Sequence, residues 1–476
     1  MRKHKAFNVG GFDHDSDRIS PMTRPSLRAC STHLPQWRDF PTTGSIDMSK
    51  KQLAIMGTRG IPAQHGGFET FAERLALYLT KRGWIVTVYC QGQVGGTQVI
   101  EDSWCGIKRI FVPVKRDGAL GTVEFDWKSV QIAAKRETPL VLTLGYNTAV
   151  FCTYLRARGV RNLINMDGLE WRRTKWRWYE RTWLYMNERI GCWTGNHLIA
   201  DHPSIAVHLA TRVKNRKITM IPYGADRIEE SGCSVPRELG LGQVRYALVI
   251  ARPEPENSIV EIVTAFSRRP RGAKLVVLGK YDSVGNPYHR EVMDAAGPEV
   301  LFMGPIYDQN AVKALRYHAL FYLHGHQVGG TNPSLVESLG ASSAIIAHDN
   351  PFNRWVAGSD ARFFANESEC DLHISALLAD PPTVNAMREA SGRRFNSAFR
   401  WDSVLAQYEA LLERNHVDEK KPNVSPVPPA VEPAPLGTLL KPAAARSTLS
   451  VTEARAHVSS VEADAIFKET EISRRR

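Results

Sequence analysis

A glycine-rich loop near the start of the folded part of the chain has the composition of a phosphate-binding segment. Gly57, Arg59 and Gly66-Gly67 lie between an apolar strand pattern and a helical pattern that begins near Phe68. Glycines after a strand let backbone N–H groups approach a ligand closely, and a helix N-terminus adds partial positive charge. The loop contains neither GxGxxG nor GxxxxGK[ST], which disfavours a dinucleotide fold and a P-loop. An ordinary tight strand–helix connection would have the same composition.

A second segment, residues 324–337, also follows a strand pattern and could hold a diphosphate. Thr331 or Asn332 can cap a helix that starts at Pro333. The backbone N–H groups at that helix end would then be available to an anion. Glu337 lies one turn further on, where its carboxylate could accept hydrogen bonds from ribose hydroxyls.

A third segment places an arginine directly after a strand pattern. Arg252 follows the apolar residues 246–251. A planar guanidinium at the end of a strand and facing a cleft suits phosphate binding. The alternative is a surface salt bridge to Glu254 or Glu256.

The apolar patterns around these segments alternate between strands and helices, which predicts an α/β fold built on parallel sheets. One series starts at the strand pattern 52–56 and a second at 246–251, so two α/β halves of similar size meet near residue 225. The expected organisation is a disordered tail over 1–47, domains over 48–225 and 226–400, an amphipathic helix over 401–416 and a disordered Pro/Ala-rich tail over 417–476. Met48 could be the true start of translation.

Composition limits the classes of protein to which the chain can belong. The 476 residues carry a formal net charge of +12, with 43% hydrophobic and 23% charged residues. These values are typical of a globular chain with anionic partners such as nucleotide phosphates, anionic lipids or nucleic acid. No run of about eighteen apolar residues and no signal-peptide pattern is present. Seven cysteines without a CxxC pair favour a reduced, cytosolic protein.

Five long motifs resemble those of the bacterial family-4 retaining glycosyltransferases, in particular the rhamnosyltransferase-like branch, whose N-terminal domain is a domain of unknown function. In order, over about residues 51–415, they are GTRGIPAQHGGFET, NMDGLEWRRTKW, ARPEPEN, GGTNPSLVESLGA and AHDNPFNR. The resemblance implies two facing Rossmann-like domains of the GT-B type. The nucleotide-sugar donor would bind mainly to the C-terminal domain and the acceptor to the N-terminal domain, to which the final helix would cross back. It implies no cofactor and no catalytic metal.

The same resemblance implies roles for individual residues. The donor would be bound by Gly66, Gly67, Arg252, Asn257, Lys280, Gly329, Gly330, Thr331, Asn332 and Glu337. The acceptor would be bound by Arg59, Glu69, Asp167, Glu170 and Trp171. The expected catalytic set is Asp167, Arg252, Lys280 and Glu337.

The sequence departs from the family pattern at three positions. The first of two glutamates that the family has eight positions apart is Gly329 here, so backbone groups or other residues must hold the donor sugar. The usual Arg and Lys for the diphosphate become Arg252 and Asn257, and Lys280 could supply the missing charge. The usual histidine after the mid-domain strand is Asp167, which could orient a hydroxyl group or simply cap the following turn.

Two short motifs could be mistaken for metal ligands. His324 and His326 are more typical of packing or substrate-facing groups, because two histidines without a nearby cysteine or carboxylate seldom close a metal site. The string Asp13-x-Asp15-x-Asp17 resembles the metal-binding motif of the other glycosyltransferase fold, but it follows no strand pattern. We therefore expect no metal site.

The sequence contains no Ser/His/Asp arrangement and no obvious carboxylate pair for a covalent step. This absence favours a front-face displacement, in which Arg252, Lys280 and helix N-termini stabilise the leaving diphosphate. An oxygen of the diphosphate would help to take the acceptor proton. Most of the catalysis would then be electrostatic and positional.

Residues 171–193 are unusually rich in aromatic and basic side chains, with five of the eleven tryptophans and six Lys/Arg. Trp and Tyr prefer the lipid–water boundary, and cations attract anionic head groups, so a lipid-linked acceptor would explain both. A half-buried helix with a solvated basic face would fit equally well. Binding of single-stranded nucleic acid by stacking is disfavoured by the expected fold.

Together these observations favour a cytoplasmic glycosyltransferase that is peripheral at the inner membrane. It would transfer rhamnose or a similar hexose from a dTDP- or UDP-linked donor to a polyprenyl-diphosphate-linked saccharide in surface polysaccharide biosynthesis, with no nucleic-acid partner. One alternative is a nucleotide-sugar epimerase of the same architecture. Another is an inactive membrane-associated scaffold, which the loss of the glutamate at Gly329 would explain.

Overall fold

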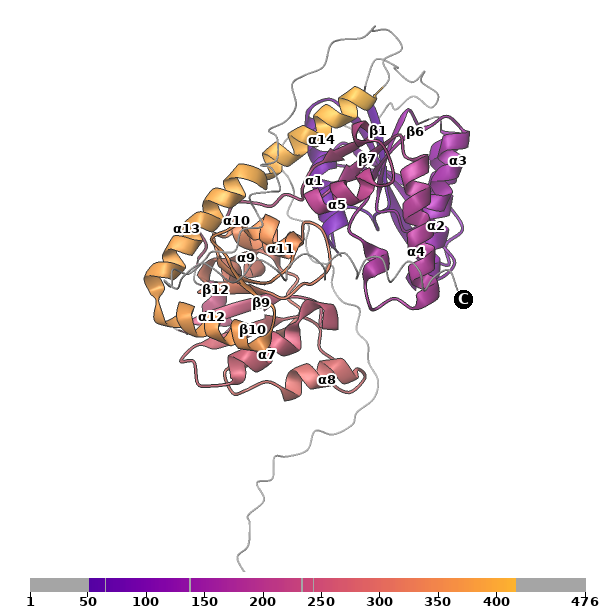
Figure 1. Ribbon diagram of the computed structural model, residues 1–476. Helices are drawn as coiled ribbons and strands as arrows, with labels where there is room; N and C mark the ends of the chain where they lie inside the picture. The colour runs from indigo at the N-terminus through magenta and orange to yellow at the C-terminus, as the bar shows by residue number, and fades with distance from the viewer. Residues whose placement is uncertain (1–50, 65, 137, 233, 243, 417–476) are drawn as a thin grey trace, which may run out of the picture. The chain divides into compact units, whose positions relative to one another are not determined.

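The computed structural model describes residues 51–64, 66–136, 138–232, 234–242 and 244–416 (Figure 1). These residues form two α/β lobes, each built on one mainly parallel sheet, which confirms the predicted fold class. Among the described helices, none is long and apolar enough to cross a membrane. The expectations for the two tails, for Met48 and for the aspartates at 13, 15 and 17 lie outside the described residues.

The N-terminal lobe contains an eight-stranded sheet with strand order β3-β4-β2-β1-β5-β6-β7-β8. All neighbouring strands are parallel except β3 and β4, which form an antiparallel pair at one edge. The strands are β1 (Gln52–Met56), β2 (Ile85–Val94), β3 (Ile100–Trp104), β4 (Ile107–Val114), β5 (Leu140–Leu144), β6 (Arg161–Asn165), β7 (His197–Ala200) and β8 (Ile218–Met220). The helices are α1 (Gly67–Lys81), α2 (Gly118–Lys135), α3 (Cys152–Ala157), α4 (Trp178–Thr194) and α5 (Pro203–Ala210), with 3-10 turns η1 (Ala149–Phe151), η2 (Glu170–Arg172) and η3 (Asn215–Lys217).

The C-terminal lobe contains a six-stranded parallel sheet with strand order β11-β10-β9-β12-β13-β14. The strands are β9 (Tyr246–Ile250), β10 (Lys274–Leu278), β11 (Val300–Gly304), β12 (Phe321–His324), β13 (Ala344–His348) and β14 (Arg362–Phe364). The helices are α6 (Ser234–Glu238), α7 (Ile259–Ser267), α8 (Pro287–Asp294), α9 (Gln309–His318), α10 (Pro333–Gly340), α11 (Pro351–Ala357), α12 (Glu367–Ala379) and α13 (Pro381–Ala398), with the 3-10 turn η4 (Pro255–Asn257). The final helix, α14 (Trp401–Asn415), packs on the N-terminal lobe.

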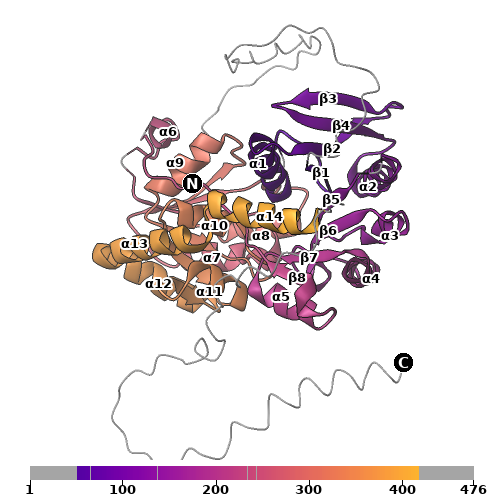
Figure 2. The same ribbon diagram turned by 90° about the horizontal axis from the view of Figure 1, so that it is seen from above.

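Alternation along the central strand β1 explains why helices cover both faces of the first sheet. Leu53 and Ile55 point into a core shared with α1 and α14, whereas Ala54 and Met56 point into a second core shared with α2. Successive side chains of a strand point to opposite faces, so an uninterrupted apolar strand requires cover on both. Figure 2 shows α1 and α14 on one side of the sheet and α2, α3 and α4 on the other.

Helix α14 is tied to α1 by aromatic and aliphatic packing. Its apolar residues at helical spacing, including Val404 and Leu411, are buried in the same core as Leu75 of α1. The rings of Phe71 and Tyr408 have centroids 4.6 Å apart. Residues more than three hundred positions apart therefore share one core.

The sequence analysis did not predict the antiparallel pair β3 and β4 or the edge strand β14. Residues of β3 are mostly exposed and polar, so they lack the alternation that marks a half-buried strand. β14 has three residues, too few for a periodic signal. The central strands were predicted because they are buried on both faces, as β5 is at every position.

The glycine loop after β1 gives a test of backbone packing. Gly57 has φ +82°, and a Cβ atom there would lie 2.2 Å from the carbonyl oxygen of Leu144. We expect Gly57→Ala to lower the free energy of unfolding by about 3 kcal/mol or more, because it adds a clash with backbone to an unfavourable dihedral angle. Urea unfolding of the purified protein would measure the loss.

Gly83 provides the matched control. Its φ is +86°, but no heavy atom lies within 4 Å of a Cβ built there. Gly83→Ala should therefore lower the free energy of unfolding by only about 1 kcal/mol, because it adds an unfavourable dihedral angle without a clash. Equal losses for the two variants would contradict the packing explanation.

Candidate functional site

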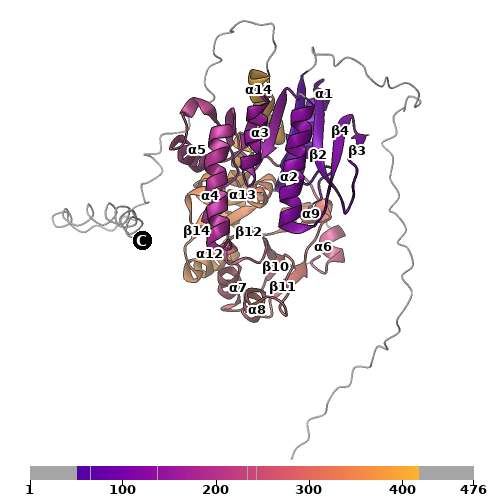
Figure 3. The ribbon, with the colours of Figure 1, turned by 90° about the vertical axis from the view of Figure 1, so that its right-hand side faces the viewer.

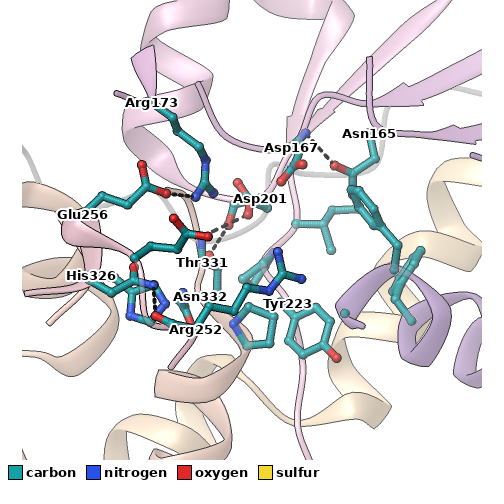
Figure 4. A pocket seen from close by; sticks show the side chains of 18 of the residues that line it. Asn165, Asp167, Arg173, Asp201, Tyr223, Arg252, Glu256, His326, Thr331 and Asn332 are labelled. Atoms are coloured by element: carbon teal, nitrogen blue, oxygen red, sulfur yellow. Dashed lines mark hydrogen bonds and ion pairs between the residues drawn. The ribbon is translucent and has the colours of Figure 1, made fainter. Parts of the chain in front are cut away.

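A cavity of about 340 Å³ lies at the carboxyl ends of the parallel strands, where loops from both sheets meet (Figure 4). Ligands of open α/β sheets bind at this edge, because the strand ends there present loops and helix N-termini. The lining residues are Gly67, Phe68, Phe71, Asn165, Asp167, Arg173, Lys175, Asp201, Ile221, Pro222, Tyr223, Arg252, Glu254, Glu256, Asn257, His326, Thr331, Asn332, Pro333 and Tyr408.

Asp167 is held in a strained backbone conformation at the end of β6. Its φ is +48°, in the left-handed region that a non-glycine residue rarely adopts. Its backbone N–H donates to Oδ1 of Asn165 at 2.9 Å, and Nδ2 of Asn165 donates to the hydroxyl oxygen of Tyr408 at 3.0 Å. Tyr408 of the final helix α14 therefore holds the side chain of Asn165, which in turn holds the backbone of Asp167.

Burial and neighbouring carboxylates raise the pKa of Asp167. Burial, together with the neighbouring charges of Glu170 and Asp201, raises the pKa of Asp167 to about 7. Burial also raises the pKa of Asp201 to about 6, although hydrogen bonds from backbone N–H groups oppose the shift. Perturbed carboxyls in a cavity are typical of functional sites.

Arg173 is the main cation that compensates these carboxylates. Its Nε lies 2.6 Å from a carboxylate oxygen of Glu170, and its Nη1 lies 2.6 Å from a carboxylate oxygen of Glu256. Glu170 belongs to the N-terminal lobe and Glu256 to η4 of the C-terminal lobe, so the guanidinium joins the two. The other carboxylate oxygen of Glu256 is buried without a hydrogen-bond partner in the described structure.

A second polar link joins Asp201, which follows β7, to the loop before α10. The N–H of Thr331 donates to Oδ2 of Asp201 at 2.9 Å, and the Thr331 hydroxyl donates to the backbone carbonyl of Asp201. The loop backbone lies so close to this carboxylate that a Cβ atom on Gly330 would be 2.2 Å from Oδ1 of Asp201. A side chain at position 330 would therefore displace the carboxylate of Asp201.

The N-terminus of α10 forms the wall of the cavity on the side of the C-terminal lobe, called the C-terminal wall below. Asn332 caps the helix, because its Oδ1 accepts a hydrogen bond from the N–H of Ser334 at 3.0 Å, and Pro333 occupies the first turn. Arg252 lines the same wall and forms no ion pair within the described part of the chain. The predicted alternative, a salt bridge from Arg252 to Glu254 or Glu256, is wrong.

Asn257 acts through the backbone of the arginine loop. It is buried, and its Nδ2 donates to the backbone carbonyl of Arg252 at 2.9 Å. Its amide therefore holds the loop that presents the guanidinium. Asn350 and Asn353 have a comparable role, because both side-chain amides donate to the backbone carbonyl of His326, at 3.0 Å and 2.8 Å.

The cavity brings together some of the residues predicted from the sequence and leaves others outside. Those that line it are Gly67, Asp167, Arg252, Asn257, Thr331 and Asn332. Those that do not are Arg59, Gly66, Glu69, Glu170, Trp171, Lys280, Gly329, Gly330 and Glu337. Gly329 nevertheless lies beside the loop that carries Asp167, since a Cβ atom on Gly168 would lie 3.3 Å from the carbonyl carbon of Gly329.

Two side chains that were predicted to bind the donor, those of Glu337 and Lys280, lie outside the cavity. Glu337 forms an ion pair with the buried guanidinium of Arg316 at 2.6 Å, so its carboxylate is already engaged within the C-terminal lobe. Lys280 follows β10 and is exposed.

The predicted acceptor-binding side chains of Glu69, Glu170 and Trp171 hold local structure. Oε1 of Glu69 accepts the backbone N–H of Arg59 at 3.0 Å, which closes the glycine loop onto α1. Nε1 of Trp171 donates to Glu188 at 2.6 Å, and that buried carboxylate also contacts His208. These contacts keep the loops in place without exposing the side chains to the cavity.

Several lining residues were not predicted as site residues. Asp201 directly follows a parallel strand, so strand order could have indicated its place at the carboxyl edge. Arg173 and Glu256 lie beside motif residues, but their pairing across the two lobes could not be inferred from sequence spacing. Tyr223 and Tyr408 come from the linker and from α14, and only the packing of the two lobes brings them to the cavity.

The two histidines of the segment 324–337 are stacked and buried. The rings of His324 and His326 have centroids 4.3 Å apart, and burial lowers the pKa of His326 to about 3. In the described residues, no group of three or more His, Cys, Asp or Glu side chains could hold a metal ion. Both rings are therefore neutral at neutral pH and pack together.

A sequence family matches the N-terminal lobe, whereas solved structures match both lobes. Residues 50–226 match a sequence family described as a domain of unknown function, DUF1972. No curated protein matches the chain in sequence.

Solved structures are similar over both lobes. Sucrose-phosphate synthase from Thermosynechococcus elongatus has a TM-score of 0.66 and 18% identity, covering 77% of this chain and 99% of its own. HepE from Anabaena, in complex with UDP and glucose, has a TM-score of 0.61 and 13% identity, covering 77% and 100%. An α,α-trehalose-phosphate synthase (UDP-forming) from Burkholderia xenovorans has a TM-score of 0.58 and 12% identity, covering 76% and 100%. The fold is thus that of GT-B glycosyltransferases.

The raised pKa of Asp167 predicts how stability depends on pH. The pKa is about 7 in the folded chain and about 3.9 in an unfolded one. Between these values the folded chain keeps a proton that the unfolded chain releases, so the free energy of unfolding falls as pH rises through this window. We expect Asp167→Asn to reduce the loss of stability between pH 5 and pH 8, measured by urea unfolding.

An exposed aspartate supplies the control. Asp360 is exposed, and Asp360→Asn should leave the pH dependence of the wild-type protein unchanged. If Asp167→Asn behaves like Asp360→Asn, the buried carboxyl does not bind a proton in the way described.

Proposed function

We propose that the protein is a glycosyltransferase that uses a nucleotide-sugar donor. The observation that carries this proposal is the cavity in which Arg252 and the N-terminus of α10 lie opposite Asp167. A helix N-terminus and a guanidinium stabilise a diphosphate, and a carboxylate on the far side can bind sugar or acceptor hydroxyls. The similar structures in complex with UDP and with UDP-glucose support this assignment.

The C-terminal wall is the proposed donor site, and the N-terminal wall the proposed acceptor site. Arg252 and the α10 N-terminus bind the diphosphate, and the backbone of the loop Gly329–Thr331 borders the sugar. Asp167 orients a hydroxyl group of the acceptor or of the donor. Lys280 and Glu337 do not line the cavity, so a direct role for them requires movement of the loops that carry them.

The proposed chemistry is a front-face displacement that retains configuration. An acceptor hydroxyl oxygen bonds to the anomeric carbon while the bond from that carbon to the diphosphate oxygen breaks. The acceptor proton passes to an oxygen of the departing diphosphate, whose charge Arg252 and the helix N-terminus stabilise. We expect no metal and no cofactor to be needed.

We further propose that the donor is a dTDP- or UDP-linked hexose such as rhamnose, and that the acceptor is a lipid-linked saccharide at the cytoplasmic face of the inner membrane. The pathway would be the synthesis of a surface polysaccharide. These assignments rest on the resemblance of the motifs and on the composition of α4.

Helix α4 presents the surface that would contact the membrane. Its outward side chains include Trp178, Met186 and Trp193, whose exposed fractions are 78%, 54% and 59%. Arg181 and Arg189 are exposed on the same helix. Large apolar side chains flanked by cations are typical of helices that lie in the lipid–water interface.

Nucleotide binding tests the donor site. Arg252→Ala should weaken the binding of UDP or dTDP by about tenfold to a hundredfold, because a charge-assisted hydrogen bond contributes roughly 1.5–3 kcal/mol. Titration calorimetry would measure the affinity. Arg393→Ala removes an arginine of the same lobe that is 70% exposed, and it should leave the affinity unchanged.

Turnover then separates transfer from the alternatives. Nucleotide release that requires both one donor and a membrane lipid extract indicates transfer. Conversion of the donor without any acceptor would indicate an epimerase. Absence of binding and turnover with dTDP-, UDP- and GDP-sugars would contradict both and favour a scaffold.

Vesicle binding tests the membrane surface. The double variant Trp178→Ala/Trp193→Ala should bind phosphatidylglycerol vesicles at least about tenfold more weakly, because two large apolar side chains no longer enter the interface. Sedimentation with vesicles would measure binding. Tyr307→Ala, which removes an aromatic side chain that is 77% exposed in the C-terminal lobe, is the control and should bind as the wild type does.

A further inference from the structure

An apolar groove separates α2 from η1 and α3 on the N-terminal lobe. Its volume is about 780 Å³. The lining side chains are Leu120, Val123, Glu124, Trp127, Val150, Phe151, Thr153, Tyr154 and Ala157. The floor is aromatic, since the ring centroid of Trp127 lies 5.2 Å from that of Phe151 and 5.6 Å from that of Tyr154.

The polar side chains of the groove are already paired within the protein. Glu124 forms an ion pair with Lys128 at 2.7 Å and accepts the N–H of Lys115 at 2.8 Å. The hydroxyl of Thr153 donates to a backbone carbonyl, and that of Tyr154 accepts from Arg158 at 2.9 Å. A ligand would therefore meet mainly hydrocarbon and aromatic surface. A hydrocarbon chain suits such a surface, whereas a peptide backbone would leave its polar groups unpaired.

The groove begins at the same edge of the sheet as the cavity. Leu120 lies in the first turn of α2, and η1 follows β5, so both start at the carboxyl ends of parallel strands. The loop between β5 and η1 touches the cavity loop, because the hydroxyl of Tyr146 donates to the carbonyl of Gly168 and accepts the N–H of Glu170. One end of the groove is thereby linked to the loop that carries Asp167.

Helix α4 contacts η1 and the loop before it, beside the groove. Nε1 of Trp183 donates to the carbonyl of Asn147, and the side chain of Asn187 accepts the N–H of Val150. Figure 3 shows α2, α3 and α4 side by side on the same face of the lobe. The mouth of the groove has exposed cations as well, at Lys115, whose backbone N–H donates to Glu124 of the groove, and at the adjacent Arg116. Such cations complement a phosphate group attached to an apolar chain.

We propose that this groove binds the hydrocarbon chain of the lipid-linked acceptor, which places its phosphate at the basic mouth and its saccharide toward the cavity. The inference rests on the proposed function, in that it assumes a lipid-linked acceptor, but it assigns a separate site. Leu120 is the most accessible large apolar side chain of the groove, with 64% of its surface exposed.

Photocrosslinking of the full chain tests the groove. The probe is geranylgeranyl phosphate with a diazirine near the end of its chain. Mass spectrometry should find the crosslinks in 120–127 and 150–157. Leu120→Glu should reduce crosslinking at least tenfold, because it places a charge in the apolar lining. The variant should fold, since the side chain is exposed and a glutamate suits the first turn of a helix.

Leu372→Glu is the matched control, because Leu372 is 66% exposed on α12 of the other lobe. It should crosslink as the wild type does, and both variants should bind UDP equally well. Tenfold excess of phosphatidylglycerol vesicles should not displace the probe.

Three results would overturn the assignment. They are crosslinks confined to α4 or to the C-terminal lobe, undiminished labelling of Leu120→Glu, and displacement of the probe by the vesicles, which would make the groove a general bilayer contact. Failure of nucleotide binding with correct crosslinks would instead contradict the donor proposal alone. Transfer to a soluble acceptor without crosslinks would contradict the groove alone.

Discussion

The cavity depends on the ion pairs that the guanidinium of Arg173 forms with Glu170 and Glu256. Four carboxylates, those of Asp167, Glu170, Asp201 and Glu256, lie near one another at the meeting of the two lobes. Such a group of acids is stable only if some are compensated and others bind protons. Arg173 compensates Glu170 and Glu256 directly. Burial raises the pKa values of Asp167 and Asp201, and neighbouring carboxylates raise that of Asp167 further.

The same electrostatics connects the lobes. The Arg173–Glu256 ion pair and the hydrogen bond from Thr331 to Asp201 both cross from one lobe to the other. The second contact uses a backbone N–H group beside the N-terminus of α10, where the proposed donor diphosphate would bind. The nucleotide sugar and Asp201 would therefore bind to neighbouring backbone N–H groups.

The sequence was sufficient for the fold class and for the strands at the centre of each sheet, because strands buried on both faces form uninterrupted apolar runs. It also predicted that Asp167, Arg252 and Asn332 follow strands, and all three line the cavity. It could not predict Tyr408 or the partner of Glu256, because these positions depend on the packing of segments far apart in the chain. Trp171 and Glu69 were assigned to the acceptor by resemblance, whereas each side chain is engaged in a local hydrogen bond.

The place of Tyr408 has a consequence for biosynthesis. Its hydroxyl accepts the hydrogen bond from Asn165 that positions Asp167, and its ring packs on Phe71. Translation reaches residue 408 only after both sheets have been made. Until then α14 is absent, and the apolar face of α1 that it covers is exposed on the nascent chain. The cavity cannot acquire its final geometry while the ribosome is still adding the C-terminal lobe, and an incomplete chain carries no finished site.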